Sequence, residues 1–197
     1  MIRNYLVATI SVILVVVGGF LLVQNLKNKT LPTGTMSQPT PSLYPTTVPQ
    51  TPLTGRPQVT ITTSKGDIVI EMRPDLAPKT VANFLDKFTH GYCNNLTWHR
   101  VEDWVVQGCD PKGDGTGGNT TLLTETSSQP FTIGAVGVAR KASPKEVSND
   151  SQFFVVKKDS TFLNGEYTYF GQVVSGMDVV NKLEIGDRII SSTIMSK

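Results

Sequence analysis

The first 57 residues of this 197-residue chain contain no aspartate and no glutamate, but they contain four basic residues. The formal net charge of +2 therefore arises from this segment, because the chain from Gln58 onward has 14 basic and 16 acidic side chains. Lysine and arginine form no cluster in that acidic remainder, which argues against the basic surface by which proteins bind nucleic acid. We expect no nucleic-acid partner.

Cysteine and histidine are also scarce, with two of each in the chain. They do not combine with Asp or Glu at the spacing of metal ligands. The sequence also has no clear pairing of a nucleophile with an activating base. We therefore expect neither a metal ion nor a cofactor.

One long apolar run is present, from Tyr5 to Val23. As a helix of about 19 residues it would span roughly 28 Å, close to the hydrocarbon thickness of a bilayer. It is longer than the apolar part of a typical signal peptide, and no clear cleavage site follows it. We predict that residues 1–29 are an uncleaved transmembrane anchor; a cleaved signal peptide and a buried core helix are the alternatives. Basic residues are nearly balanced across the run, and we expect the short N-terminal tail in the cytoplasm and the rest of the chain outside.

Residues 30–57 hold seven of the 12 prolines, mixed with Thr, Ser and Gln, and have no periodic apolar face. Such a segment cannot bury enough apolar surface to fold, and it favours extended polyproline II. We predict a linker at 30–57 and a single folded domain, a monomer, at 58–197.

From residue 58 onward, short apolar runs alternate with turn signals. Residues 59–63 and 67–72 flank Ser-Lys-Gly, a pattern typical of a hairpin. Pro78 suits the first turn of a helix, and Val81, Phe84, Leu85 and Phe88 follow at helical spacing. We expect a second helix at 176–183, a loop at 141–150 and further strands at 132–139, 152–156, 169–174 and 188–194. Many strands with two helices favour a closed antiparallel barrel capped by the helices.

The most informative stretch is 96–118. Two apolar runs, 96–101 and 104–107, flank Glu102-Asp103, which predicts a tight β-hairpin. Arg100 and Gln107 could then stand near one another on a mostly apolar sheet. The Gly-rich loop that follows can bring its backbone close to a bound chain.

Four strings occur in order: Trp-His-Arg-Val (98–101), Val-Val-Gln-Gly (105–108), Gly-Asp-Gly-Thr-Gly-Gly (113–118) and Ser-Gln-Phe-Phe (151–154). Together they resemble the cyclophilin family of peptidyl-prolyl isomerases, over about residues 59–197. The resemblance implies an eight-stranded barrel, proline-containing polypeptides as partners and catalysis of rotation about X-Pro bonds. That rotation faces a barrier of about 18–20 kcal/mol from amide resonance, and it requires no nucleophile, metal or base.

The resemblance also implies a site. Arg100 matches the catalytic arginine, which would donate toward the prolyl amide. Gln107 matches the glutamine that helps to hold the substrate backbone and the arginine. The positions that match the substrate-binding walls are Trp104, Val105, Ala139, Arg140, Gln152, Phe154, Phe162, Leu163 and Tyr167.

Several of these positions depart from the usual family pattern. The connection between Arg100 and Gln107 is one residue shorter, and Trp104 stands where Phe is usual. Arg140 stands in place of Asn, Phe162 in place of a Trp found in some members, and Tyr167 in place of His. His99 resembles the family's structural histidine, and by strand alternation we expect it on the face opposite Arg100.

Cys93 precedes the first run of the hairpin and Cys109 follows the second. Pairing about a Glu102-Asp103 turn would put Cys109 opposite Leu96, within a short reach of Cys93. A disulfide and two buried or free thiols are both open; a disulfide suits an extracytoplasmic domain.

These observations predict a membrane-tethered prolyl isomerase that acts on exposed X-Pro bonds of folding or secreted polypeptides. Its arginine would stabilise a twisted amide held in an apolar proline pocket. The alternative from another class is a cyclophilin-like proline-peptide binding module, or a chaperone, with little turnover. A structural surface domain on a stalk is a third possibility.

Overall fold

The computed structural model describes residues 55–195. The predicted anchor and nearly all of the predicted linker lie outside these residues. Within the described part, no helix is both long enough and apolar enough to cross a membrane.

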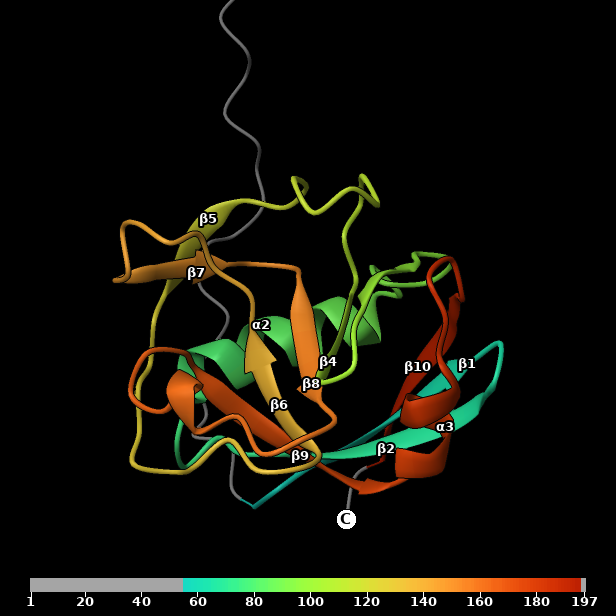
Figure 1. The fold of residues 1–197 in the computed structure, drawn as a ribbon, viewed down its shortest axis with the longest axis horizontal. Helices are drawn as coiled ribbons and strands as arrows, with labels where there is room; N and C mark the ends of the chain where they lie inside the picture. Colours follow the sequence, from blue (N-terminus) through green and yellow to red (C-terminus); the bar gives the residue numbers. More distant parts are fainter. Residues whose placement is uncertain (1–54, 196–197) are drawn as a thin grey trace, which may run out of the picture. The chain divides into compact units, whose positions relative to one another are not determined.

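Eight strands form one antiparallel sheet in the order β10–β1–β2–β9–β6–β8–β4–β3, and the sheet curls around the core (Figure 1). In chain order they are β1 (Gln58–Thr63), β2 (Gly66–Met72), β3 (Trp98–Val101), β4 (Val105–Gly108), β6 (Ala135–Val138), β8 (Phe153–Val156), β9 (Tyr169–Ser175) and β10 (Ile189–Met195).

The predicted mainly β architecture, with one helix after the first hairpin and a second before the last strand, is confirmed in the described residues. The predicted closed barrel is confirmed only in its eight curled antiparallel strands. In the described residues, the edge strands β3 and β10 share no ladder. The segments at their starts, 95–98 and 186–189, are joined by the bridge between Thr97 and Arg188 and by four backbone hydrogen bonds.

A second, two-stranded sheet pairs β5 (Thr120–Leu123) with β7 (Val147–Asn149), beside the main sheet in Figure 1. The prediction of a loop over 141–150 was therefore wrong at β7. This strand has only three residues, two of them polar, and it is defined by pairing with a segment some 25 residues away rather than by a pattern of its own. Its partner β5 was not predicted either.

Helix α2 (Pro78–Thr89) begins at the predicted proline and buries Val81, Phe84 and Phe88. The backbone N–H groups of its first turn have no partners within the helix. A residue distant in sequence caps them: the Glu125 carboxylate accepts hydrogen bonds from the Lys79 and Thr80 backbone nitrogens. A second helix, α3 (Met177–Lys182), lies near β2 (Figure 1), and a short 3₁₀ helix, η1 (Thr161–Leu163), follows β8.

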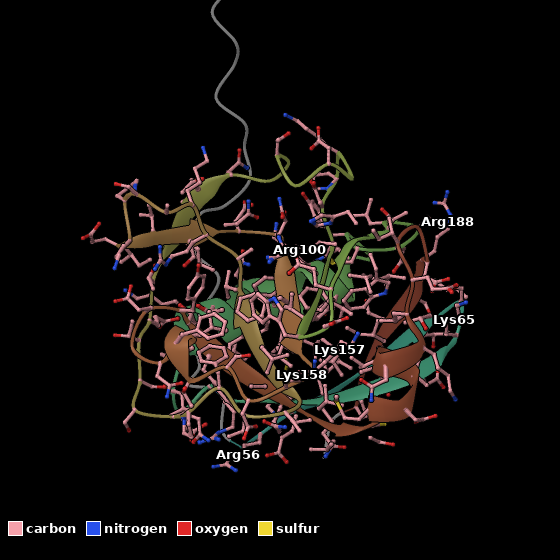
Figure 2. The ribbon with its side chains drawn as sticks, in the orientation of Figure 1. Arg56, Lys65, Arg100, Lys157, Lys158 and Arg188 are labelled. Atoms are coloured by element: carbon pink, nitrogen blue, oxygen red, sulfur yellow. A yellow bond between two sulfur atoms is a disulfide. The ribbon has the colours of Figure 1, made fainter. Side chains whose placement is uncertain are left out.

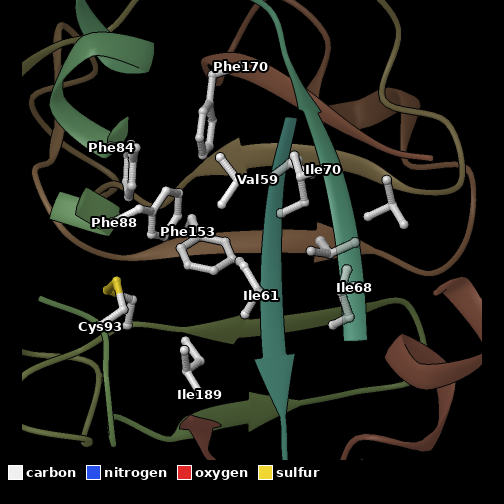
Figure 3. Packing of buried hydrophobic residues seen from close by; sticks show 14 of the residues in the cluster. Val59, Ile61, Ile68, Ile70, Phe84, Phe88, Cys93, Phe153, Phe170 and Ile189 are labelled. Atoms are coloured by element: carbon white, nitrogen blue, oxygen red, sulfur yellow. A yellow bond between two sulfur atoms is a disulfide. The ribbon is translucent and has the colours of Figure 1, made fainter. Parts of the chain in front are cut away.

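Aromatic rings join α2 to the sheet. Phe84 stacks on Phe170 of β9 at 4.6 Å between ring centroids, and it meets Phe153 of β8 edge-on at 6.0 Å. Figure 3 shows these rings packed beside Val59 and Ile61 of β1. The predicted helical face is confirmed, since Leu85, its fourth member, also packs partly buried against this core.

Candidate active site

The β3–β4 hairpin places Arg100 directly opposite Gln107. The predicted β-hairpin is confirmed, but its turn was placed one residue too early: Val101 pairs with Val106, and the Glu102 N–H donates to the Val105 carbonyl at 2.8 Å, so the turn centres on Asp103-Trp104. A turn centred on Glu102-Asp103 would have put Arg100 opposite Val105. Because the difference is two residues, every side chain keeps its face of the sheet while its partner changes. This register brings the two predicted catalytic residues side by side.

A chain of side-chain hydrogen bonds runs from Arg100 to the Gly-rich loop. Arg100 Nη1 donates to Gln107 Oε1 at 3.3 Å, and Gln107 Nε2 donates to Gln152 Oε1 at 2.8 Å. Gln152 Nε2 then donates to the carbonyl oxygens of Gly115 and Gly117 at 3.1 and 2.8 Å. Gln107 and Gln152 thereby orient one another and hold the loop over the sheet.

The other side of Arg100 contacts Glu102. Arg100 Nε donates to Glu102 Oε1 at 2.7 Å, and the indole N–H of Trp104 donates to Glu102 Oε2 at 2.8 Å. The guanidinium lies 5.3 Å from the Trp104 ring centroid. The hydrogen bond from Arg100 lowers the pKa of the Glu102 carboxyl, so Glu102 is ionised at neutral pH. The sequence interpretation treated Glu102 only as a turn residue; its place two residues after the arginine is the signal that could have singled it out.

A pocket of about 400 Å³ opens beside Arg100 of β3, which Figure 2 labels. Its lining includes nine of the eleven predicted catalytic and substrate-binding residues, which are Arg100, Trp104, Val105, Gln107, Ala139, Arg140, Phe154, Leu163 and Tyr167. His99, Asp114 and Gly115 complete the lining. Gln152 lines an adjoining pocket of about 290 Å³ with the Gly-rich loop, Ala139, Arg140 and Lys141. Phe162 lines neither pocket.

Apolar side chains form the walls of the larger pocket. Val105, Phe154 and Leu163 belong to one buried cluster. The Phe154 ring meets Tyr167 edge-on at 5.8 Å and is backed by Phe131 at 5.9 Å. The pocket therefore pairs a cationic rim with aromatic and aliphatic walls.

Phe162 is 66% exposed and lies next to the pocket rather than in its lining. Its ring meets Trp104 edge-on at 5.2 Å. Trp104 thus contacts Phe162 on one side and the Arg100–Glu102 pair on the other, and the two rings extend the apolar surface past the rim.

Arg140 is fixed over Tyr167. Its guanidinium lies 4.3 Å from the Tyr167 ring centroid, donates to the Glu166 carboxylate at 3.1 Å and bonds the Glu166 carbonyl through Nε at 2.9 Å. Nη1 bonds the carbonyl of Lys141 at 2.9 Å. With its side chain only 4% exposed, Arg140 is a structural brace between the two pockets.

His99 does not follow the expected alternation. The ladder shifts between Trp98 and Arg100, and His99 is among the residues that line the larger pocket. Both ring nitrogens are buried without a hydrogen-bond partner among the described residues, and burial lowers the pKa of the imidazole. The ring is therefore held neutral.

The Gly-rich loop is held from beneath by Asp110, which is buried. Its carboxylate accepts hydrogen bonds from the backbone nitrogens of Lys112 and Asp114 at 3.0 and 3.1 Å. Gly117 lies so close to Asp110 that a Cβ there would overlap the carboxylate. The acidic group thus shapes the loop that faces both pockets.

Cys93 and Cys109 form a disulfide with their Cα atoms 5.0 Å apart, the first of the two alternatives that the sequence left open. Both residues are buried. The bond ties the segment after α2 to the end of β4, directly before Asp110. It therefore anchors the base of the hairpin that carries Arg100 and Gln107.

Comparison with known proteins gives one consistent family. The family model described as "Cyclophilin type peptidyl-prolyl cis-trans isomerase/CLD" matches residues 58–195. The chain is 40% identical over 154 residues to the "Probable peptidyl-prolyl cis-trans isomerase" of Brucella suis, covering 66% of this chain and 78% of that protein. It is 35% identical over 131 residues to "Peptidyl-prolyl cis-trans isomerase CYP18-2" of Arabidopsis thaliana, covering 64% and 80%.

Solved structures agree. The crystal structure of a cyclophilin-type peptidyl-prolyl cis-trans isomerase of Cryptosporidium parvum superposes with a TM-score of 0.67 at 28% identity, covering 73% of this chain and 99% of that one. The same protein, crystallised in the presence of the dipeptide Ala-Pro, gives a TM-score of 0.65 at 29% identity and covers 71% and 99%.

Proposed function

This chain belongs to the cyclophilin-type peptidyl-prolyl cis-trans isomerase family, and from that premise we propose that it accelerates X-Pro rotation through Arg100. The observation that carries the proposal is the position of Arg100 at the rim of an apolar pocket, bonded to Gln107 on one side and Glu102 on the other. Among the described residues, none accepts a hydrogen bond from Arg100 Nη2, which leaves this donor for a substrate.

Uncatalysed X-Pro rotation takes tens to hundreds of seconds, because the transition state gives up amide resonance. In that state the amide is twisted, and its nitrogen becomes pyramidal with its lone pair localised on the nitrogen instead of shared with the carbonyl. A fixed cationic donor stabilises this lone pair far more than it stabilises the planar ground state, and only such differential binding speeds the reaction. Arg100 supplies the donor, and Gln107 helps to hold the substrate backbone.

The proline ring would enter between Phe154, Leu163 and the ring of Tyr167, whose carbon atoms can bury it. The relative crystallised in the presence of Ala-Pro supports a prolyl dipeptide as the minimal ligand. We therefore assign exposed X-Pro bonds of peptides and folding polypeptides as the substrate class.

We further propose that residues 1–29 anchor the isomerase domain (58–197) to a membrane and that residues 30–57 tether it. Twenty-eight residues in polyproline II reach roughly 80–90 Å. The Cys93–Cys109 disulfide supports an oxidising, extracytoplasmic location for the domain, because such bonds persist mainly outside the cytosol.

The direct test is cis/trans exchange of a short Ala-Pro peptide, followed by NMR with catalytic amounts of the full-length chain in detergent. We expect accelerated exchange, and a loss of about 100-fold in kcat in Arg100→Ala, the cost typical of removing one preorganised donor. Peptide binding without accelerated exchange would show a recognition module instead of an isomerase.

A further inference from the structure

The hairpin tip carries an acidic side chain, Glu102, whose two carboxylate oxygens are both engaged. One accepts from Arg100 Nε at 2.7 Å and the other from the Trp104 indole N–H at 2.8 Å. A single carboxylate therefore joins the proposed catalytic arginine to an aromatic wall of the pocket.

The backbone under Glu102 is itself fixed. Its N–H donates to the Val105 carbonyl at 2.8 Å across the turn. Its carbonyl accepts from Lys157 Nζ at 3.0 Å, and the Lys157 N–H donates to the Trp104 carbonyl at 2.7 Å. Lys157 (Figure 2) directly follows β8, so the hairpin tip is tied to the neighbouring strand and the carboxylate starts from a fixed point.

These contacts determine how Arg100 is held. Its Nε is bonded to Glu102 and its Nη1 to Gln107, so the planar guanidinium is fixed at two of its three nitrogens. An arginine has a long, flexible stem, and orienting it before the substrate arrives removes that ordering from the activation step.

We propose that Glu102 is a positioning residue of the isomerase site, acting through Arg100 and Trp104 on a substrate it does not touch. This inference rests on the proposed function. It also explains two departures from the family pattern together: the shortened turn brings a carboxylate beside the arginine, and Trp104 supplies an N–H that phenylalanine lacks.

Glu102 has a second, opposing effect, because its negative charge reduces the positive field of Arg100. Both side chains are partly exposed, at 41% and 45%, and water and salt screen that charge. The hydrogen bond that orients the Arg100 guanidinium depends on geometry and is screened less. The orienting effect of Glu102 on Arg100 therefore outweighs the loss of positive field, and removing the carboxylate lowers kcat.

The experiment measures kcat and KM for X-Pro exchange with the full-length chain in detergent. Glu102→Ala is expected to lower kcat about fivefold to tenfold and to change KM by less than about twofold, since the pocket walls remain. Glu102→Gln keeps one oxygen acceptor and is expected to fall between wild type and Glu102→Ala. The matched control is Asp103→Asn, which removes an exposed neighbouring charge and is expected to keep wild-type kcat.

A second comparison separates positioning from a general structural role. Glu102→Ala is repeated in the Arg100→Ala background, at enzyme concentrations that reveal the residual acceleration. Because Glu102 is proposed to act mainly through Arg100, Glu102→Ala is expected to have a much smaller effect there, and the remainder measures its contact with Trp104. A structural residue lowers kcat by the same factor in both backgrounds. Thermal melting verifies that each variant is folded.

Three results overturn the inference: an unchanged or raised kcat in Glu102→Ala, an equal loss in Asp103→Asn, or an equal loss without Arg100. These are distinct from failure of the proposed function, in which the wild-type chain itself does not accelerate exchange or Arg100→Ala retains full activity.

Discussion

The packing beneath the pocket beside Arg100 depends on a residue without a side chain, Gly137 of β6. It pairs directly with Phe154 of β8, whose ring lies over the glycine backbone. Its φ angle is outside the left-handed region, so alanine can adopt the same backbone conformation. A Cβ there would overlap Phe154 Cζ and would lie 2.8 Å from Phe131 Cε1. Gly137→Ala therefore tests the link between core packing and the site.

The size of the effect follows from these distances. Carbon atoms pack comfortably at about 3.5–4.0 Å, so both rings must shift by roughly 1 Å. Overpacking of this kind costs about 1–3 kcal/mol, and the lower backbone entropy of unfolded alanine returns about 0.5–1 kcal/mol. The net loss of about 1–2 kcal/mol lowers Tm by roughly 4–8 °C for a domain of this size.

Displacement of Phe154 also narrows the space in front of it, because its other neighbour is Tyr167 at 5.8 Å. KM for a prolyl peptide is therefore expected to rise about threefold to tenfold, while kcat changes less because Arg100 lies outside the shifted pair of rings. Circular dichroism melting and NMR exchange kinetics measure the two effects.

Phe154→Leu provides the control, because it shortens the side chain that meets the added methyl group. The leucine substitution should cost at least about 0.5 kcal/mol less in the Gly137→Ala background than in wild type. Unchanged Tm and KM in Gly137→Ala would refute the packing argument, as would strictly additive effects of the two substitutions.

Three further predictions follow from other contacts. Replacing Cys93 and Cys109 by alanine opens a loop with a sequence separation of 16 and should lower the free energy of unfolding by about 3 kcal/mol; urea unfolding measures it, and an unchanged midpoint would contradict the role given to the disulfide. Arg140→Ala frees the Tyr167 ring and should raise KM several-fold with a smaller change in kcat, whereas an equal fall in kcat would place Arg140 in the reaction itself. The hydrogen bonds from Arg73 lower the pKa of Asp75 below the value of about 3.9 expected in the unfolded chain. The ionised Asp75 therefore stabilises the folded state above about pH 4, and this contribution is lost as the pH falls through the folded-state pKa. Asp75→Asn should therefore lower Tm slightly at pH 7 and by progressively less as the pH falls below about 4. An equal shift at every pH would show that the charge is not the cause.

Local patterns were sufficient for most of the fold. The helix over Val81, Phe84 and Phe88 was visible because each element buries one face, and a buried face imposes a period on the sequence. The short strands β5 and β7 left no such trace, because they are held by pairing between distant segments.

The sequence predicted the site residues that belong to recognisable sequence strings. It did not predict the contacts that depend on the register of the strands. The alternation of side chains places Arg100 and Gln107 on the same face of the sheet. A change of two residues in strand register leaves every side chain on its face, so the alternation could not show that these two residues pair. The bulge at His99 likewise breaks alternation without a sequence signal. The bond from Glu102 to Arg100 depends on the shape of the turn, and the disulfide depends on how closely the backbone brings its cysteines.

The most direct test of the central claim separates binding from catalysis in Arg100→Ala. The full-length chain is titrated with an Ala-Pro peptide by NMR, and exchange between the cis and trans signals is measured at saturation. The account predicts that the peptide still binds, with Kd within about fivefold of wild type because the apolar pocket remains, while exchange slows by about 100-fold. Rapid exchange in this variant would contradict the assignment of Arg100 as the group that lowers the barrier.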